Sequence, residues 1–180
     1  LIIPGIAGED LQAAITAISA MGLDHRNNTI TGGIIACTGS AGCKFAAAET
    51  KGNAIALGKH LASTMILDQP INLHLTGCQN SCAQHYIGDI GMMGTRVKVG
   101  DGSTVDGYNI VLGGGVDDTQ AIAREIWKSV RADEMPALIE KLLVTYLRDR
   151  IDDEPFAAFA NRHTPEQLMD LCDPAKTAAA

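Results

Sequence analysis

The sequence predicts an α/β (α+β) fold in which helices flank a mixed β-sheet. Residues 71–76 alternate apolar and polar side chains, which is the period of a half-buried strand. Residues 9–21 instead repeat apolar side chains along one helical face and stop at Gly22. Each of two strand-like runs ends in a loop that is rich in Gly, Ser, Thr and Asn and that holds a pair of cysteines. Both kinds of element are therefore expected in one domain.

The N-terminal part of the chain is expected to hold two strands with a helix between them. Residues 1–4 are expected to end a strand, and residues 9–21 form the helix described above. Residues 29–36 predict a second strand that leads into the first cysteine loop. Gly32 and Gly33 lie within this strand and allow another backbone to approach closely.

The middle of the chain predicts one helix and one hairpin. Residues 45–65 predict an Ala-rich helix that begins directly after the first cysteine loop. Its first amides and the positive end of its dipole would then face an anionic cluster or a cofactor carboxylate. Glu49 and Lys51 are expected on the solvated face of this helix. Residues 87–99 and 104–112 predict the two strands of a hairpin.

The C-terminal third predicts mainly helices. Glycines 113–115 lack the spacing of a nucleotide-binding loop. They indicate either backbone packed on a flat macrocycle or a tight strand-to-helix turn. Long helices are expected at 119–130 and 132–150, and short ones at 156–161 and 165–172.

Several side chains of these helices have predicted structural roles. Pro136 suits the first turn of its helix. Leu138, Leu142 and Tyr146 form one apolar stripe and are predicted to be core residues. Cys172, the fifth cysteine, is expected to be an inert packed thiol.

Composition restricts the classes of function. The chain has 180 residues, 46% of them hydrophobic, and a formal net charge of −7, which argues against a nucleic-acid surface. No apolar run approaches the roughly 20 residues of a membrane helix, and the first residues lack the basic flank of a signal peptide. The missing initiator Met fits a piece of a longer protein. The odd number of cysteines favours a reducing compartment, so we expect a cytoplasmic protein.

Four of the five cysteines form two pairs. Cys37 and Cys43 enclose five residues, and Cys78 and Cys82 enclose three. Zinc sites usually use gaps of two to four residues, whereas a longer gap leaves room to wrap a larger body. The small residues between the cysteines let backbone amides approach the sulfurs. This chemistry favours an iron–sulfur cluster and leaves open zinc, disulfides and reduced cysteines that merely pack.

The spacing and context of the cysteines resemble those of a known family. The runs are ACTG at 36–39, TGCQNSC at 76–82, IGDIGMMG at 87–94 and YNIVLGG at 108–114. Together they resemble the assimilatory nitrite and sulfite reductase haemoproteins, and the resemblance extends over about residues 2–172.

The resemblance implies two cofactors and the residues that hold them. A [4Fe–4S] cluster would be bound by Cys37, Cys43, Cys78 and Cys82. The thiolate of Cys82 would also be the axial ligand of a sirohaem iron. Asn80, between two of the cysteines, would either reach a cluster sulfide as part of the cofactor site or cap the loop.

The resemblance also implies how the chain is divided. Residues 1–28 would be a partial ferredoxin-like segment at the N-terminus. Residues 29–172 would form the [4Fe–4S]/sirohaem-binding domain, which has the nitrite/sulfite reductase haemoprotein fold. Residues 173–180 are expected to be a flexible tail. The sequence matches only the C-terminal half of the family, so the N-terminal half of the same protein is an expected partner.

The implied function is assimilatory reduction, most simply of nitrite to ammonia. Asn80 and Ser81 before the last cysteine resemble the nitrite-reducing members, and sulfite reduction to sulfide is the alternative. Electrons would come from a small donor such as ferredoxin or a flavoprotein. Whether this half is catalytic alone stays open, because the basic residues over the substrate come mostly from the missing half.

Other interpretations and other residues remain open. The chain could be a cluster-carrying electron relay or a non-catalytic module, or it could be related to an enzyme of corrin biosynthesis. Lys44, Arg96 and Lys98 could meet sirohaem carboxylates or be surface charges. His85 could be a proton donor or cofactor contact, or a hydrogen-bonded structural histidine.

Overall fold

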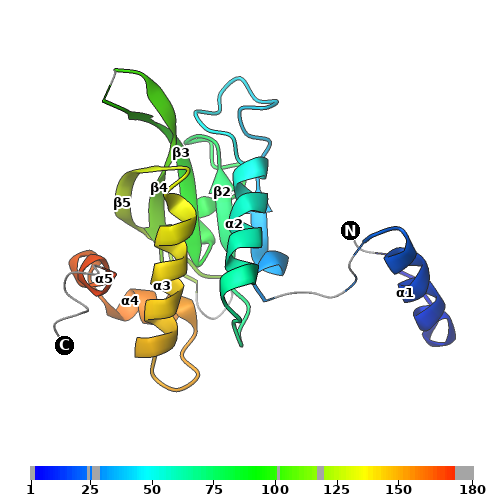
Figure 1. Cartoon of the computed structure of the whole chain (residues 1–180). Coiled ribbons are helices and arrows are strands. Elements are labelled where there is room, and N and C mark those ends of the chain that lie inside the picture. Colours follow the sequence, from blue (N-terminus) through cyan, green and yellow to red (C-terminus); the bar gives the residue numbers. More distant parts are fainter. Residues whose placement is uncertain (1–2, 24, 26–28, 101, 117–119, 173–180) are drawn as a thin grey trace.

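A five-stranded mixed sheet forms the centre of the protein in a computed structural model (Figure 1). The structure describes residues 3–23, 25, 29–100, 102–116 and 120–172. The strand order is β1-β2-β3-β4-β5, with β1 to β3 parallel and β3 to β5 antiparallel. The strands are β1 (Ile34–Ala36), β2 (Leu73–Thr76), β3 (Ile90–Lys98), β4 (Thr104–Leu112) and β5 (Arg124–Arg131). The predicted mixed sheet with flanking helices is confirmed.

Two longer helices lie side by side against the sheet, and two short ones follow (Figure 1). The longer helices are α2 (Lys51–Thr64) and α3 (Met135–Asp149), and the short ones are α4 (Phe156–Arg162) and α5 (Pro165–Leu171). The helices predicted at 132–150, 156–161 and 165–172 are thus present, with Pro136 in the first turn of α3. Fully buried side chains from both layers form the core, among them Leu57, Leu61, Leu73, Leu75, Ile90, Met92, Tyr108, Ile110, Ile139 and Leu142.

The structure confirms the stripe of α3. Leu142 and Tyr146 are buried, and Leu138 packs against the same core. Cys172 is buried as well, and burial raises the pKa of its thiol. A raised pKa keeps a thiol protonated and unreactive, in agreement with the predicted inert role.

One predicted helix is wrong. Within the described part of 119–130 the chain forms β5, which pairs antiparallel with β4 through Tyr108↔Val130. The spacing of Ile122, Ile126 and Val130 suits one face of a helix, but the edge of β4 offers backbone partners for hydrogen bonds. Ser129, at φ 53°, interrupts the pairing, and its amide donates to Asn109 Oδ1 at 2.9 Å. Residues 117–119 lie outside the described residues.

The predicted strand at 71–76 is shorter and more buried than expected. All four residues of β2 are buried, including His74 and Thr76. A strand with parallel neighbours on both sides is covered on both faces, so alternation does not mean half burial here. His74 Nδ1 is satisfied by the carbonyl of Gln84 at 3.0 Å.

The helix predicted at 45–65 begins six residues late, at Lys51. Residues before Lys51 use their backbone groups elsewhere: the Ala47 amide donates to the Gly77 carbonyl at 2.7 Å, and the Ala48 carbonyl accepts from the Ser40 amide at 3.1 Å. The sequence predicted that the helix begins directly after Cys43. The structure corrects this, because the helix begins at Lys51.

The remaining strand predictions are confirmed in part. The strand expected at 29–36 is limited to β1, because Thr31–Gly33 form a 3₁₀ turn. A Cβ on Gly33 would collide with the Ile71 carbonyl, so the predicted close approach is present. The hairpin of β3 and β4 is present, and its turn residue 101 lies outside the described residues. Ile3 and Pro4 are not in a strand, and residues 1–2 are outside the described residues.

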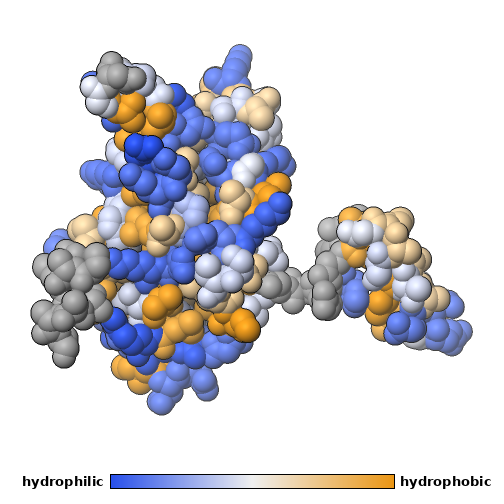
Figure 2. All heavy atoms as spheres, in the orientation of Figure 1, coloured by the Kyte–Doolittle hydropathy of each residue, from blue (hydrophilic) through white to orange (hydrophobic). Residues whose placement is uncertain are grey.

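The N-terminal segment lies apart from the sheet (Figure 1). Its helix, α1 (Leu11–Ala20), confirms the predicted helix, but none of its residues is buried. Figure 2 shows apolar side chains exposed on this segment. They line a groove of about 510 Å³, formed in part by Ile3, Ile6, Leu11, Ile15, Ile18 and Met21. Among the described residues, no helix has the length and apolar character needed to cross a membrane.

Candidate metal centre

The two cysteine loops lie next to each other at one edge of the sheet. β1 and β2 are parallel neighbours, with Ala36 opposite Leu75, so their carboxyl ends meet at the same edge. The Cys37 amide donates to the Leu75 carbonyl at 3.1 Å. Cys78 follows β2 after a single intervening glycine. The expectation that two strand ends bring these loops together is met.

The sulfur of Cys37 contacts hydrogen-bonding groups of two other chain segments. Its Sγ accepts a hydrogen bond from the Gly77 amide at 3.1 Å, which joins the first loop to the second. Its Sγ also lies 3.8 Å from the hydroxyl of Thr50. Both contacts cross from one chain segment to another and fix the sulfur in place.

The surroundings of Cys37 favour its thiolate. Partial burial raises the pKa of the Cys37 thiol, but the pKa is lowered overall. The opposing contributions are hydrogen bonds from the amides of Gly77 and Gly39. Weaker ones come from the hydroxyls of Thr50 and Thr76. A thiolate is the form that binds metal, so this position suits a ligand.

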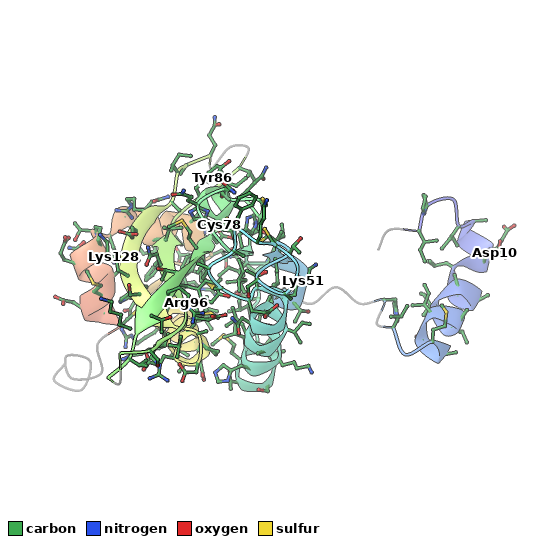
Figure 3. The ribbon with its side chains drawn as sticks, turned by 90° about the horizontal axis from the view of Figure 1, so that it is seen from above. Asp10, Lys51, Cys78, Tyr86, Arg96 and Lys128 are labelled. Carbon is green, nitrogen blue, oxygen red and sulfur yellow. The ribbon has the colours of Figure 1, made fainter. Side chains whose placement is uncertain are left out.

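Three of the four cysteines, Cys37 among them, are half-buried, and one is exposed. Cys43 and Cys78 are half-buried and Cys82 is exposed, and all are free thiols rather than disulfides. In Figure 3, Cys78 lies among the loops at one end of the sheet. Asn80 is exposed in the same loop, and Ser81 has a left-handed φ of 54° just before Cys82. An exposed last sulfur leaves space for a second group against it.

The donor set fits an iron–sulfur cluster, which binds Cys thiolates. A single ion draws all its ligands to one point, whereas each thiolate of a [4Fe–4S] cluster binds a different iron. Four free thiols on two adjacent loops, with amides directed at one of them, fit that larger body.

Glycine is required where the loops touch. Gly39 has φ +69°, and a Cβ there would lie 2.6 Å from both the amide nitrogen and the hydroxyl of Thr50. A Cβ on Gly77 would lie 2.7 Å from the Cβ of Ala46. Small residues thus allow the loop backbones to approach each other and the sulfurs, as predicted.

A polar network that the sequence did not reveal braces the first loop. The Glu49 amide donates to Asp106 Oδ2 at 2.8 Å, and the Glu49 carbonyl accepts from the Tyr108 hydroxyl. Asn53 Nδ2 donates to the Tyr108 oxygen at 2.9 Å and to the Glu49 carbonyl at 2.7 Å. Burial raises the pKa of Tyr108 to about 12, so its hydroxyl stays a donor.

This network corrects the expectation that Glu49 is on a solvated face. Glu49 is half-buried, and its carboxylate accepts from the Asn53 amide at 3.1 Å, at the start of α2. Lys51 is exposed, as expected. Thr50, directly between them, is fully buried. Its partners are 13 residues away along the chain, so no local pattern could have shown its role.

The other polar candidates have structural partners. His85 Nδ1 lies 2.6 Å from Ser81 Oγ, and its pKa is lowered by burial and by His74, which fits a hydrogen-bonded structural histidine. Arg96 forms an ion pair with Asp106 within the β3–β4 hairpin.

The structure also shows the surroundings of Lys44 and Lys98, the two other candidate contacts to sirohaem carboxylates, and of glycines 113–115. Lys98 is exposed, and Lys44 Nζ lies 5.1 Å from the ring of Phe45. Gly113 has φ +81°, and a Cβ on Gly114 would lie 2.5 Å from the carbonyl of Gly88. These glycines form a tight turn on neighbouring backbone.

Comparison with known proteins shows the family of the chain. Residues 29–177 match the family described as the nitrite and sulphite reductase 4Fe-4S domain. The chain is 33% identical to "Sulfite reductase [ferredoxin] 1" of Mycolicibacterium paratuberculosis over 93% of its own length and 31% of the relative. It is 37% identical to "Ferredoxin--nitrite reductase" of Synechococcus elongatus over 73% of its own length and 24% of the relative.

Two solved structures have a similar fold. The NirA protein of Mycobacterium tuberculosis superposes with a TM-score of 0.81 at 30% identity, covering 93% of this chain and 31% of that one. A dissimilatory sulfite reductase superposes with a TM-score of 0.71 at 12% identity, which shows the fold alone. The chain thus spans about a quarter to a third of the length of the curated relatives named above.

Proposed function

The chain belongs to the nitrite and sulphite reductase family, and we propose that it is the cluster-bearing, C-terminal part of an assimilatory reductase that converts nitrite to ammonia. The family implies the two cofactors expected from the sequence, a [4Fe–4S] cluster and sirohaem. The observation that carries the proposal is the parallel pairing of β1 and β2, which brings both cysteine loops to one edge and places Cys37 Sγ on the Gly77 amide.

The proposed ligands of the cluster are Cys37, Cys43, Cys78 and Cys82. Of these, Cys82 is the exposed one, so its thiolate is the one that could also serve a sirohaem iron lying outside the loop. Asn80, exposed beside it, is the proposed polar contact to the cofactors. When bound, the cluster and sirohaem supply the electron transfer that nitrite reduction needs.

The residues of the chain hold this site rigid. Gly39 and Gly77 let the two loops pack without intervening side chains, and the Gly77 amide stabilises negative charge on a ligand sulfur. Tyr108 and Asp106 fix the first loop to β4. Such preorganisation lets a cluster change charge with little movement of the protein.

Substrate and donor follow from the relatives and the loop sequence. The names of the relatives include both nitrite and sulfite reductases, and both name ferredoxin. We propose nitrite as the substrate because Asn80 and Ser81 precede the last cysteine, with ferredoxin or a flavoprotein as donor. Sulfite reduction is the second candidate, favoured by the 33% identity over 93% of the chain.

The division of the chain is also a proposal. Residues 29–172 would be the cofactor domain, and residues 1–28 a partial ferredoxin-like segment. The exposed apolar face of α1 supports this, since such a face needs a covering partner. The N-terminal half of the same protein would supply that cover and the basic residues over the substrate. The protein is proposed to be cytoplasmic. The flexible tail expected at 173–180 lies outside the described residues.

The test uses the full-length protein, purified without oxygen. We expect about four cluster irons with matching sulfide, sharp sirohaem bands, and reduction of nitrite faster than of sulfite with reduced ferredoxin. A spectrum with broad cluster absorbance alone would instead identify an electron relay, and one with neither feature a non-catalytic module. Faster turnover of sulfite than of nitrite would select the second candidate.

The shared thiolate is tested by Cys82→Ser in the same protein. We expect loss of the sirohaem coupling together with a disturbed cluster. A Cys82→Ser protein that keeps both cofactors with unchanged spectra would show that the ligand assignment is wrong. Cys172→Ser is the matched control, because Cys172 is buried at the end of α5 and its neighbours are residues of α3.

A further inference from the structure

A fully buried threonine joins the first cysteine to the start of α2. The Thr50 hydroxyl donates to the Cys37 carbonyl at 2.7 Å and lies 3.8 Å from Cys37 Sγ. Thr50 is 0% exposed and precedes the first residue of α2. Its carbonyl accepts from the Ala54 amide at 2.8 Å in the first turn of the helix. The side chain of Thr50 does not cap that helix, so its hydroxyl is directed at the cysteine instead.

The contact is enforced by the loop backbone. Gly39 lies so close to Thr50 that any side chain at position 39 would overlap the Thr50 amide and hydroxyl. On the other side of Cys37, the Gly77 amide donates to the sulfur. The sulfur of Cys37 is therefore held between the second cysteine loop and Thr50.

The second cysteine loop has a weaker counterpart. Thr76 is 1% exposed and donates to the Cys78 carbonyl at 3.4 Å. Each pair of cysteines thus begins with a residue whose carbonyl is bound by a buried threonine. The bond made by Thr50 is the shorter one, and it joins residues 13 apart in the chain, whereas the bond from Thr76 to the Cys78 carbonyl joins residues two apart.

We propose that Thr50 is a positioning residue for the iron–sulfur cluster: it holds Cys37 in the orientation that binds iron and stabilises the reduced, more negative cluster. This inference rests on the proposed cluster ligands. Hydrogen-bond donors near the sulfurs of a cluster stabilise its reduced state and raise its reduction potential. The Thr50 hydroxyl donates its hydrogen to the Cys37 carbonyl oxygen, so it offsets the negative end of that carbonyl close to the ligand sulfur, and removing the hydroxyl removes this offset. The reduced state would then be less favourable.

The experiment compares three variants of the full-length protein, loaded with cofactors without oxygen. Thr50→Val removes the hydroxyl and keeps the shape, and Thr50→Ser keeps the hydroxyl. Thr145→Val is the matched control, because Thr145 is also a buried threonine and lies beside Cys172, outside the site. Iron and sulfide content, the rate of iron release to a chelator, and the midpoint potential of the cluster are measured.

We expect Thr50→Val to bind the cluster, to release iron about five- to tenfold faster, as for the loss of one buried hydrogen bond, and to titrate at a lower potential. Thr50→Ser and Thr145→Val should match the unaltered protein. Equal potentials and release rates in Thr50→Val and the unaltered protein would overturn the proposal, as would equal changes in Thr50→Val and Thr50→Ser.

Two further outcomes are also decisive. If Thr50→Val loads no cluster, the thermal unfolding of the cluster-free proteins is compared. A midpoint equal to that of cluster-free Thr145→Val supports positioning, and a lower midpoint shows a merely structural role and overturns it. A cluster absent from the unaltered protein would refute the proposed function itself, which separates that failure from this one.

Discussion

The sharpest test of the packing at the site is Gly39→Ala. Gly39 has φ +69°, and an alanine in this left-handed conformation costs about 1–2 kcal/mol. The new Cβ would also lie 2.6 Å from the Thr50 amide nitrogen, which is backbone at the start of a helix and cannot rotate away. Overpacking of this kind costs a further roughly 1–3 kcal/mol. The total expected loss of stability is about 2–5 kcal/mol.

Gly102→Ala separates the two contributions. Gly102 also has a left-handed φ, +84°, but a Cβ there would meet no atom within 4 Å. This control carries the backbone strain without the overlap, so we expect a loss of about 1–2 kcal/mol. Heating the full-length protein, followed by circular dichroism and by bleaching of the cluster absorbance, measures both variants. The overlap predicts that only Gly39→Ala bleaches well before the protein unfolds. Equal midpoints and simultaneous bleaching in the two variants would refute this reasoning.

Three further predictions concern residues around the site and the core. Tyr108→Phe removes one donor from the Glu49 carbonyl, but Asn53 still donates to that oxygen. We therefore expect the free energy of unfolding, measured with denaturant, to fall by only about 1 kcal/mol. A fall of more than roughly 3 kcal/mol would contradict this view of the network. Cys172 should resist alkylation in the native, cluster-free protein while exposed Cys82 reacts, as followed by mass spectrometry; equal labelling would contradict the burial. Burial raises the pKa of Asp89, so its charged form destabilises the fold at neutral pH, and Asp89→Asn should raise the unfolding midpoint at pH 7. That gain should fade as the pH falls through the raised pKa, and a gain that is constant with pH would show another cause.

The meeting of the two cysteine loops could be predicted because it depends on local signals. Strand-like runs, each followed by a polar loop with a cysteine pair, place the loops at strand ends, and parallel neighbours then bring those ends together. The sequence could not show that residues 45–50 lie outside the helix. Their hydrogen bonds go to Ser40, Gly77 and Tyr108, and the partner of Glu49 is 59 residues away.

The wrong helix at 119–130 has a comparable cause. Ile122, Ile126 and Val130 have helical spacing, yet only Ile126 is buried and Ile122 is 68% exposed. The segment pairs with β4, whose outer edge would otherwise carry unpaired amides and carbonyls. Long-range pairing therefore outweighs the local pattern, as it does for β2, where burial on both faces hides the expected alternation.

The four proposed ligands differ in a way that bears on how the site would work. Cys37 is held by an amide, a buried threonine and the packing of Gly39, whereas Cys82 is exposed beyond a strained Ser81. A donor at the sulfur of Cys37 stabilises added negative charge without requiring solvent, so the surroundings of Cys37 would set the potential of the cluster. The exposed sulfur of Cys82 can meet a second group. Changes near Cys37 should therefore alter the potential, and changes near Cys82 should alter the coupling between cofactors.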